Sequence, residues 1–393
     1  MKILVVLPRF PYPLEKGDKL RAYNQIVELS KRHEIYLFCV SHIKVAPESI
    51  EALRPYCKDI RVVRLNKAVC AINVVRNWFA SKSLQMGYWN TNSSKRCYKV
   101  YEREVQPDVV YNQMVRTMPL VARSNFPKVM DFQDALSMNT ERRMDSSRGL
   151  WHYVLHYEFK MLRSSEYNAF SFFEALTIIS EADSEAIPHK KNGEIKIVSN
   201  GVDFDYFRPD AVKVPKDHDI VFCGNMSYAP NVSAARYLVE KVMPLVWAKR
   251  PATTLLLAGA SPKHSIWRLG MEDRVTVSGW VDDIRTAYSS SRVFVAPMLI
   301  GSGLQNKLLE AMAMQMPCVT TSLANIPLGG TSGDQLLVGD DAETLAEQIV
   351  SLLDNNELST RIAASGFAFV QEHYSWPAAV KPLEELLNAV VAK

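Results

Sequence analysis

The chain has 393 residues, 48% of them hydrophobic and 22% charged, which indicates a globular protein and excludes a largely disordered or disulfide-stapled one. This length predicts two or three domains, each long enough to bury its own core. The 46 basic and 42 acidic residues leave a formal charge of +4, too small to indicate a nucleic-acid-binding protein.

The first apolar run, Ile3 to Leu7, is ended by Pro8 and has no cleavage site after it. It is too short for a signal peptide or a membrane span, so we expect a buried strand and a cytoplasmic protein. None of the cysteines has metal-ligand or Cys-x-x-Cys spacing. Cys39, Cys223 and Cys318 lie in apolar runs and are expected to be buried, reduced thiols.

Short apolar runs alternate with amphipathic stretches along the whole chain. The expected strands are 2–8, 34–40, 60–65, 109–112, 128–132, 175–180, 195–200, 220–224, 254–259, 275–279, 293–297, 318–321 and 335–339. Such near-continuous apolar strands are typical of parallel sheets covered on both faces. The clearest expected helices are 18–31, 233–249, 304–314, 342–353, 358–372 and 377–393.

This alternation predicts an α/β protein with doubly wound, Rossmann-like domains. The pattern restarts near residue 200, and we expect domains at 1–202 and 203–376. A final helix at 377–393 has no strand after it and is expected to cross back over the domain interface. In the helix 18–31 we expect Leu20, Tyr23 and Val27 on one apolar stripe, with Arg21 and Glu28 elsewhere.

Residues 136–174 depart from the alternation and mix aromatic with charged side chains. Two interpretations remain open, either helices facing another domain or an amphipathic surface for a lipid or apolar acceptor. His152 and His156 are four residues apart, but without a third ligand nearby we expect no metal site.

Ligands of open α/β sheets bind beyond the carboxyl ends of the strands, so the loops there are the candidate sites. Gly17, Asp18 and Lys19 open the first helix, where backbone N–H groups could meet an anion. Gly224 and Asn225 occupy the corresponding turn of the second half. The first strand is not followed by Gly-x-Gly-x-x-Gly and the chain has no P-loop, which disfavours nicotinamide dehydrogenases and P-loop NTPases.

The segment from Gly301 to Met312 is the most informative. A Gly-Ser-Gly loop follows a strand, and a helix is expected to begin near Leu304. Its first N–H groups and Lys307 suit a phosphate, and Glu310 suits the two hydroxyls of a ribose. The alternative is an exposed lysine–glutamate pair on a surface helix.

Taken together, several segments resemble a GT-B glycosyltransferase of family 4, in the subgroup of bacterial sugar transferases of exopolysaccharide systems. The similarity covers nearly the whole chain. It rests on the Gly17 loop and on the segments Ser199–Asp203, Gly224–Met226, Ser278–Asp283 and Gly301–Met312.

This resemblance implies a retaining transferase that moves a hexose from a nucleoside diphosphate sugar to a hydroxyl of a glycan or lipid-linked acceptor. It implies acceptor binding by the first domain, donor binding by the second, and no required divalent metal or other cofactor. The implied donor-binding residues are Gly224, Asn225, Trp280, Val281, Gly301, Ser302, Gly303, Leu304, Asn306, Lys307 and Glu310.

One position departs from the family pattern. Glu310 matches the second glutamate of the family's Glu-x7-Glu motif, but the first falls on Ser302, which leaves the donor sugar open. The family's phosphate-binding arginine has no clear counterpart, and Arg236 is the nearest. Two alternatives therefore stay open, a GT-B UDP-sugar epimerase and a catalytically silent nucleotide- or glycan-binding protein.

In the first domain, Asp134 resembles the second aspartate of the subgroup's Asp-x-x-Asp run and is the candidate to orient or deprotonate the acceptor hydroxyl. The alternative is an aspartate that caps the following helix. Aromatic and basic residues also mix in segments 76–96 and 142–173, which predicts peripheral contact with an anionic membrane. The alternative is that these aromatics are core residues or line a groove for a soluble acceptor.

Overall fold

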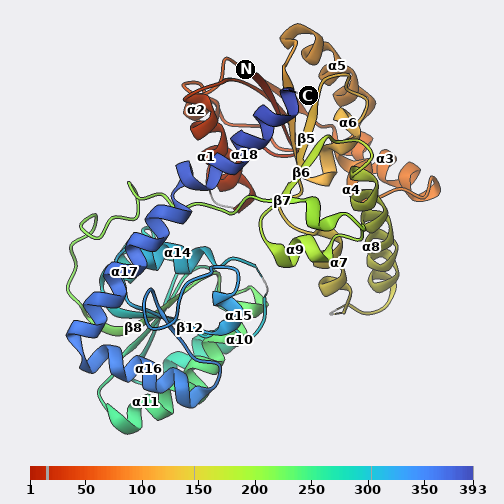
Figure 1. The fold of residues 1–393 in the computed structure, drawn as a ribbon. Coiled ribbons are helices and arrows are strands. Elements are labelled where there is room, and N and C mark those ends of the chain that lie inside the picture. Colours follow the sequence, from red (N-terminus) through yellow and green to blue (C-terminus); the bar gives the residue numbers. More distant parts are fainter. Residues whose placement is uncertain (15–16, 146, 302, 393) are drawn as a thin grey trace. The chain divides into compact units, whose positions relative to one another are not determined.

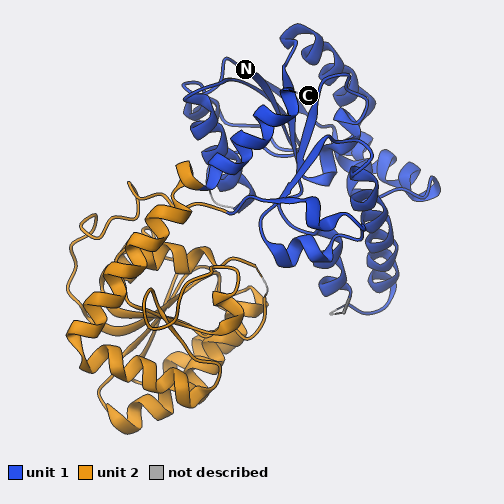
Figure 2. Cartoon of the chain, in the orientation of Figure 1, with its two compact units in different colours: residues 1–199, 379–393 blue, residues 200–378 orange. Residues whose placement is uncertain are grey.

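The computed structural model describes residues 1–14, 17–145, 147–301 and 303–392. The chain divides into two compact units, shown in Figures 1 and 2. Unit 1 contains Met1–Ser199 and Ala379–Lys393, and unit 2 contains Asn200–Ala378.

Unit 1 is built on a seven-stranded parallel sheet with the order β3-β2-β1-β4-β5-β6-β7. Its strands are β1 (Lys2–Leu7), β2 (Glu34–Ser41), β3 (Asp59–Arg64), β4 (Val109–Gln113), β5 (Lys128–Asp131), β6 (Ala175–Ile178) and β7 (Lys196–Ile197). The central strands β1 and β4 are almost completely buried, as the continuous apolar runs predict.

The helices of unit 1 connect these strands. They are α1 (Gly17–Ser30), α2 (Pro47–Leu53), α3 (Lys67–Phe79), α4 (Leu84–Trp89), α5 (Asn92–Val105), η1 (Val115–Thr117), α6 (Met118–Val121), α7 (Leu136–Asp145), α8 (Leu150–Ala169), α9 (Glu181–Ala186) and η2 (Asn192–Glu194). The aromatic-rich segment 136–174 is thus largely made of α7 and α8.

Unit 2 repeats the design with a six-stranded parallel sheet in the order β10-β9-β8-β11-β12-β13. Its strands are β8 (His218–Cys223), β9 (Leu255–Ala258), β10 (Val275–Gly279), β11 (Ser291–Ala296), β12 (Cys318–Thr320) and β13 (Leu337–Val338). Its helices are α10 (Ala229–Tyr237), η3 (Leu238–Val242), α11 (Met243–Lys249), α12 (His264–Trp267), η4 (Arg268–Met271), α13 (Ile284–Ser289), α14 (Asn306–Ala313), α15 (Ser322–Asn325), α16 (Ala342–Asp354) and α17 (Asn356–Tyr374).

The predicted fold class, α/β with doubly wound parallel sheets, is confirmed. In each sheet the chain moves outward in one direction and then returns to the other side of the first strand, so that β1 lies beside β4 and β8 lies beside β11. Such a reversal opens a crevice at the carboxyl ends of these strands, where ligands of doubly wound sheets bind.

Three expected elements differ in extent. The edge strands β7 and β13 are shorter than predicted, because an edge strand pairs on one side only. The single helix expected over 233–249 is two α-helices joined by a π-turn at Leu238–Val242. Pro244 stands in the first turn of α11, and its missing N–H prevents a regular helix from continuing through it.

The buried face of α1 is not the predicted one. Arg21, Ala22, Gln25, Ile26 and Leu29 are buried, whereas Leu20, Tyr23 and Val27 are only partly covered. The reason is tertiary, because Arg21 turns inward to a carboxylate on the sheet, and that pairing rotates the face that contacts the strands.

The C-terminal helix α18 (Trp376–Val391) begins in unit 2, and its residues from Ala379 onward belong to unit 1, as Figure 2 shows. In unit 1 it is held by Glu384, which accepts hydrogen bonds from Arg32 at 2.7 Å and from His33 at 2.8 Å. Leu383 and Leu387 are fully buried. Most of this helix therefore packs within unit 1, although the chain enters it from unit 2.

The cysteines behave as expected. Cys39, Cys223 and Cys318 are buried and unpaired. Burial raises the pKa of each of these thiols well above its usual value, so they remain protonated. In the described part of the chain, no helix is both long and apolar enough to cross a bilayer.

Candidate functional site

The reversal point of unit 2 is closely packed around two glycines at strand ends. Gly259, after β9, has φ +136°, a conformation that other residues rarely adopt. A Cβ on Gly259 would lie 2.0 Å from the carbonyl oxygen of Gly224, and one on Gly224 would lie 2.7 Å from Asn231 Nδ2. The absence of side chains here lets backbone and Asn231 meet at the mouth of the crevice.

Asn231 connects this turn to α14. Its Nδ2 donates to the carbonyl oxygen of Asn225 at 3.0 Å, and its Oδ1 accepts from Lys307 Nζ at 2.5 Å. The ammonium of Lys307 also lies 5.0 Å from the centre of the Phe222 ring. Two predicted site segments, the Gly224 turn and the start of α14, are thereby brought together.

Lys307 is a partly covered cation that forms no ion pair with any described residue. Burial lowers its pKa to about 8, although the charge of Glu310 acts in the opposite direction. No described carboxylate lies within ion-pair distance of its Nζ. The ammonium is thus poorly compensated within the protein, which is the arrangement expected of a group that waits for an anionic ligand.

Glu310 lies one turn further along α14 and accepts a hydrogen bond from Tyr288 Oη at 2.8 Å. Burial raises the pKa of this carboxyl group, and the Tyr288 bond and the Lys307 charge partly offset the effect. Lys307 and Glu310 are both partly covered, so the alternative of an exposed surface pair is wrong.

The loop before α14 differs from expectation at its end. The helix begins at Asn306 rather than near Leu304, and Gly303 and Leu304 belong to the preceding loop. Gly301 has φ +109° and stands beside Pro230 of α10. Asn306 accepts a weak hydrogen bond of 3.4 Å from Asn200. Ser302 lies outside the described residues.

The remaining donor-site candidates have separate surroundings. Trp280 is 71% exposed, and its indole N–H donates to Asp282 at 3.2 Å. Val281 beside it is partly covered. Arg236 is exposed on α10 and forms an ion pair with Glu240 at 3.0 Å. Among the described residues it makes no contact with Lys307.

Two residues of this cluster carry no motif of their own. The sequence reading missed Asn231 as the partner of Lys307 and Tyr288 as the partner of Glu310. Asn231 follows a proline at the start of a helix, which gives a weak signal for a structured turn. Tyr288 lies at the end of a short helix, and nothing in its sequence neighbourhood distinguishes it.

In unit 1, Asp134 follows β5 at the carboxyl edge of the sheet. Its Oδ2 accepts from Asn139 Nδ2 at 2.7 Å, while its Oδ1 is buried without a partner among the described residues. Burial raises its pKa to about 6, the charge of Asp183 raises it further, and Arg116 opposes both. The helix-cap alternative is not supported, because no described backbone N–H donates to this carboxylate.

A buried network of hydrogen bonds holds the end of β5, just before Asp134. Arg21 Nε donates to Asp131 Oδ2 at 2.7 Å, and the Tyr111 hydroxyl lies 2.9 Å from that oxygen. Gln133 follows with φ +65° and donates its backbone N–H to Asp131 Oδ1 at 3.0 Å. A left-handed conformation at a non-glycine residue is strained, and the network holds it in place.

The expected anion loop at Gly17 has a different environment. Asp18 is paired with Arg9 at 2.7 Å, and Gly17 has open space around its α-carbon. Lys19 is partly covered. Glu15 and Lys16, which precede this turn, lie outside the described residues.

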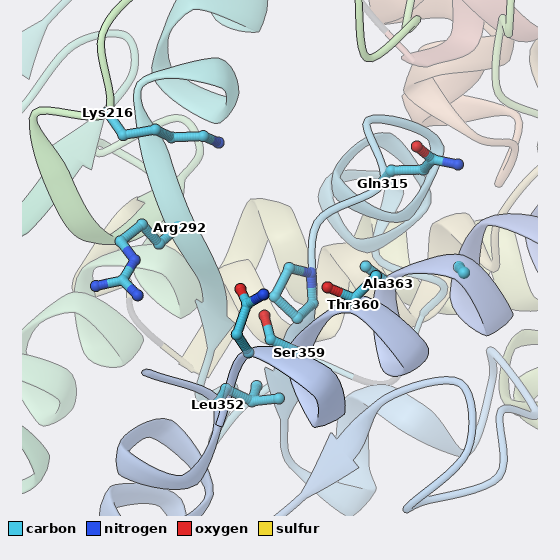
Figure 3. Close-up of a pocket in the computed structure, with 10 residues that line it drawn as sticks. Lys216, Arg292, Gln315, Leu352, Ser359, Thr360 and Ala363 are labelled. Atoms are coloured by element: carbon cyan, nitrogen blue, oxygen red, sulfur yellow. The ribbon is translucent and has the colours of Figure 1, made fainter. Parts of the chain in front are cut away.

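A separate cavity of about 480 Å³ in unit 2 is shown in Figure 3. Its lining includes Lys216, Arg292 and Pro317, which precede or begin β8, β11 and β12. It therefore opens at the amino ends of the strands, opposite the crevice. Lys216 and Arg292 are already bound to the Ser291 carbonyl and to Asp219, so this cavity is not the donor site.

Comparison with known proteins agrees with this architecture. The family described as "Glycosyl transferases group 1" matches residues 217–355. This range includes Asn231, Tyr288, Lys307 and Glu310. An uncharacterized 44.6 kDa protein in the cps region of Klebsiella pneumoniae is 23% identical over 95% of this chain and 96% of its own. The capsular polysaccharide biosynthesis glycosyltransferase CapM of Staphylococcus aureus is 23% identical over 69% of this chain and 77% of its own.

A solved structure extends the match to the whole fold. HepE of Anabaena, in complex with UDP-glucose, superposes with a TM-score of 0.67 at 14% identity, covering 98% of this chain and 99% of its own. The two doubly wound units thus have the GT-B fold. Within the chain, it is residues 217–355 of unit 2 that match the group 1 glycosyl transferases.

Proposed function

We propose that the protein is a retaining glycosyltransferase that moves a hexose from a nucleoside diphosphate sugar to a hydroxyl of a glycan or lipid-linked acceptor. The observation that carries this proposal is Lys307, a cation at the carboxyl edge of the unit 2 sheet that pairs with no carboxylate in the described part of the chain. The names of the cps-region relative and of CapM support a place in bacterial polysaccharide or glycoconjugate biosynthesis.

In this proposal the donor diphosphate lies against Lys307 and the backbone of the Gly301–Leu304 loop. Negative charge grows on the diphosphate as the glycosidic bond breaks, and a preorganised cation stabilises that charge. Glu310 accepts hydrogen bonds from the ribose hydroxyls, because its Tyr288 partner occupies only one of its oxygens. Trp280 and Val281 contribute to the donor pocket, and HepE makes UDP-glucose the first donor to test.

The acceptor is proposed to bind unit 1, with Asp134 next to its hydroxyl. The buried Oδ1 of Asp134 has a lone pair to offer, and a pKa of about 6 leaves the carboxyl group mostly ionised at neutral pH. A carboxylate so placed orients the hydroxyl and accepts its proton during transfer. Gly17, Asp18 and Lys19 line the same edge of the sheet as proposed acceptor contacts.

No divalent metal is required in this proposal, because Lys307 and backbone N–H groups supply the positive potential. The described residues contain no group of three or more metal-ligating side chains. Transfer should therefore persist in excess EDTA. Loss of activity in EDTA that Mg²⁺ or Mn²⁺ restores would contradict the metal-free mechanism.

A panel of UDP-, GDP- and ADP-sugars, followed by thermal shift, identifies the donor, since a ligand at about 100 times its Kd adds roughly 2.7 kcal/mol of stability. Nucleotide release is then measured with and without acceptor oligosaccharides or lipid extracts. Release that depends on an acceptor supports a transferase. Conversion of the sugar without an acceptor indicates an epimerase, and binding without any turnover indicates a silent binder.

Peripheral membrane contact through unit 1 is part of the same proposal. Phe79 at the end of α3 is 83% exposed, and Trp151 and Tyr153 on α8 are each 71% exposed. Other aromatics of these segments have structural roles, since Trp89 is buried and Trp78 stacks on Tyr157 at 4.6 Å. The exposed aromatics are suited to a membrane interface.

Co-sedimentation tests this contact with vesicles of phosphatidylcholine alone and with about one third phosphatidylglycerol. Binding to the anionic vesicles that weakens as salt is raised supports docking, because surface charges are screened over about 10 Å at 0.1 M salt. The Phe79→Ser variant should bind the anionic vesicles more weakly. The matched control is Met271→Ser, which changes an exposed apolar side chain of unit 2 and should bind as the wild type does. Equal recovery with and without vesicles would contradict docking.

A further inference from the structure

Unit 1 contains a cavity of about 1030 Å³ that none of the roles above uses. It is formed by α4, α5, α6 and α8, which lie together on one side of unit 1 in Figure 1. All of its lining residues fall between Asn77 and Phe172, so the cavity is complete within unit 1. We call it the basic pocket, after the cations that line it: Lys82, Lys95, Arg96, Lys99, Arg103 and Arg123.

The charge of the basic pocket is not compensated. Among the described residues, its lining contains no aspartate or glutamate, and none of its cations forms an ion pair or a side-chain hydrogen bond. Burial lowers the pKa of Lys95, and the charges of Lys82, Arg123 and Arg76 lower it further. Glu158, which is buried and accepts a hydrogen bond from the lining residue Ser83, also accepts from the backbone N–H groups of Leu84 and Gln85 at the start of α4.

Like charges are crowded along one helix of the pocket. Lys95, Lys99 and Arg103 repeat at four-residue intervals on α5, a spacing that places like charges side by side on one helix face. The opposite face of α5 buries Tyr98, Tyr101 and Val105 in the core, so the helix cannot rotate to separate its charges. An anion in the pocket would relieve the repulsion.

The lining of the same pocket also contains apolar side chains, which we call its methionine-rich floor. Met86, Met118, Leu120, Met161 and Phe172 contribute to its lining, and Phe172 is exposed at 41%. Methionines adapt to ligands of irregular shape. A simple inorganic anion would leave this surface unused, whereas a molecule with an anionic head and an aliphatic chain would cover both parts.

We infer that the basic pocket binds the phosphate or diphosphate group of an amphiphilic ligand, with the start of its aliphatic chain against the methionine-rich floor. The assignment of this ligand to the acceptor rests on the proposed function. It is supported by Arg116, which donates to Gln85 on α4 at 2.8 Å and whose charge acts on Asp134. Gln85 lies next in sequence to Met86, which lines the pocket, so Arg116 acts on Asp134 from beside the pocket.

Farnesyl diphosphate, below its micelle concentration, is a soluble probe of this chemistry. Calorimetric titration of the full chain should show tighter binding of farnesyl diphosphate than of inorganic diphosphate, and weak or no binding of farnesol. The affinity for both diphosphates should fall as salt is raised from about 50 to 300 mM. Equal affinity for the two diphosphates would overturn the amphiphilic part of the inference.

The triple variant Lys95→Gln, Arg96→Gln, Arg123→Gln should bind farnesyl diphosphate at least tenfold more weakly. It should melt no earlier than the wild type, because the substitutions remove like-charge repulsion. The matched control is Lys44→Gln, Lys190→Gln, Lys196→Gln, which removes the same charge from exposed positions of unit 1 outside the pocket and should bind within twofold of the wild type. Equal weakening in both variants would mean general electrostatic attraction and overturn the site.

Two further measurements separate this inference from the proposed function. The first is the binding of anionic vesicles in the presence of inorganic diphosphate. If a lipid in a bilayer and free diphosphate both bind the basic pocket, inorganic diphosphate should reduce the binding of the vesicles. Binding of the nucleotide sugar to unit 2 should be unchanged in the triple variant. If farnesyl diphosphate binds the pocket but no sugar transfer is found, only the proposed transferase activity is contradicted. If the triple variant transfers sugar to a lipid acceptor as fast as the wild type, only the assignment of the pocket to the acceptor is contradicted.

Discussion

The lowered pKa of Lys307 gives the donor site a pH dependence that can be worked out in advance. With a pKa of about 8, the side chain is about 90% charged at pH 7 and about 10% charged at pH 9. If only the charged form binds the donor diphosphate, the apparent Kd equals the intrinsic Kd divided by the charged fraction. The Kd of the nucleotide sugar should therefore rise about tenfold between pH 7 and pH 9.

The direction follows from the sign of the shift. Burial lowers the pKa, so the cation is present below pH 8 and is lost above it. The nucleotide sugar that binds most tightly in the donor panel is titrated calorimetrically at intervals from pH 6.5 to 9. Lys307→Arg keeps its charge throughout this range and should give a flat profile. Lys307→Met should bind weakly at every pH and also lack the slope.

The same variants test whether the lysine acts in catalysis. At saturating donor, Lys307→Met should lower turnover by about 10²–10³, the usual cost of a lost electrostatic donor. The variant should unfold no earlier than the wild type, because a cation that was buried at a cost has been removed. A Lys307→Met protein that retained the wild-type slope from pH 7 to 9 would refute the reasoning, since another group would then control binding.

Four further substitutions test the other polar groups of the two sites. Glu310→Ala should weaken donor binding by about 1.5–3 kcal/mol, the range for hydrogen bonds to a charged group, and unchanged calorimetric affinity would remove Glu310 from the site. Tyr288→Phe removes only the hydroxyl that donates to Glu310, so it should weaken donor binding less than Glu310→Ala does. Asp134→Asn should lower the rate of transfer by about 10²–10⁴ while donor binding stays intact, and normal turnover per folded molecule would argue against a base. The rate of the wild type should decline below about pH 6, because this carboxylate is then protonated. Asp131→Asn leaves the buried Arg21 charge uncompensated and should lower the free energy of unfolding by about 3–5 kcal/mol in urea titrations, and a loss below about 1 kcal/mol would show that water or another group compensates Arg21.

The sequence by itself determined the fold class. The strands that end just before Pro8 and just before Gly224 contain continuous apolar runs, which are typical of parallel sheets covered on both faces. Their alternation with helices fixed the doubly wound design, and the Gly301–Met312 segment marked the loop and helix that contain Lys307 and Glu310. These features are local, because residue type and spacing along the chain are enough to produce them.

The tertiary structure decided what no local pattern contains. The buried face of α1 is set by Arg21 reaching Asp131, a partner more than a hundred residues away, against the hydrophobic periodicity of the helix. Asn231 and Tyr288 became partners of Lys307 and Glu310 only when separate strands were placed side by side. The basic pocket likewise joins α4, α5, α6 and α8, and its uncompensated charge is visible only once those helices are packed. Pairings between distant segments depend on sheet order and helix packing, which short-range residue patterns do not encode.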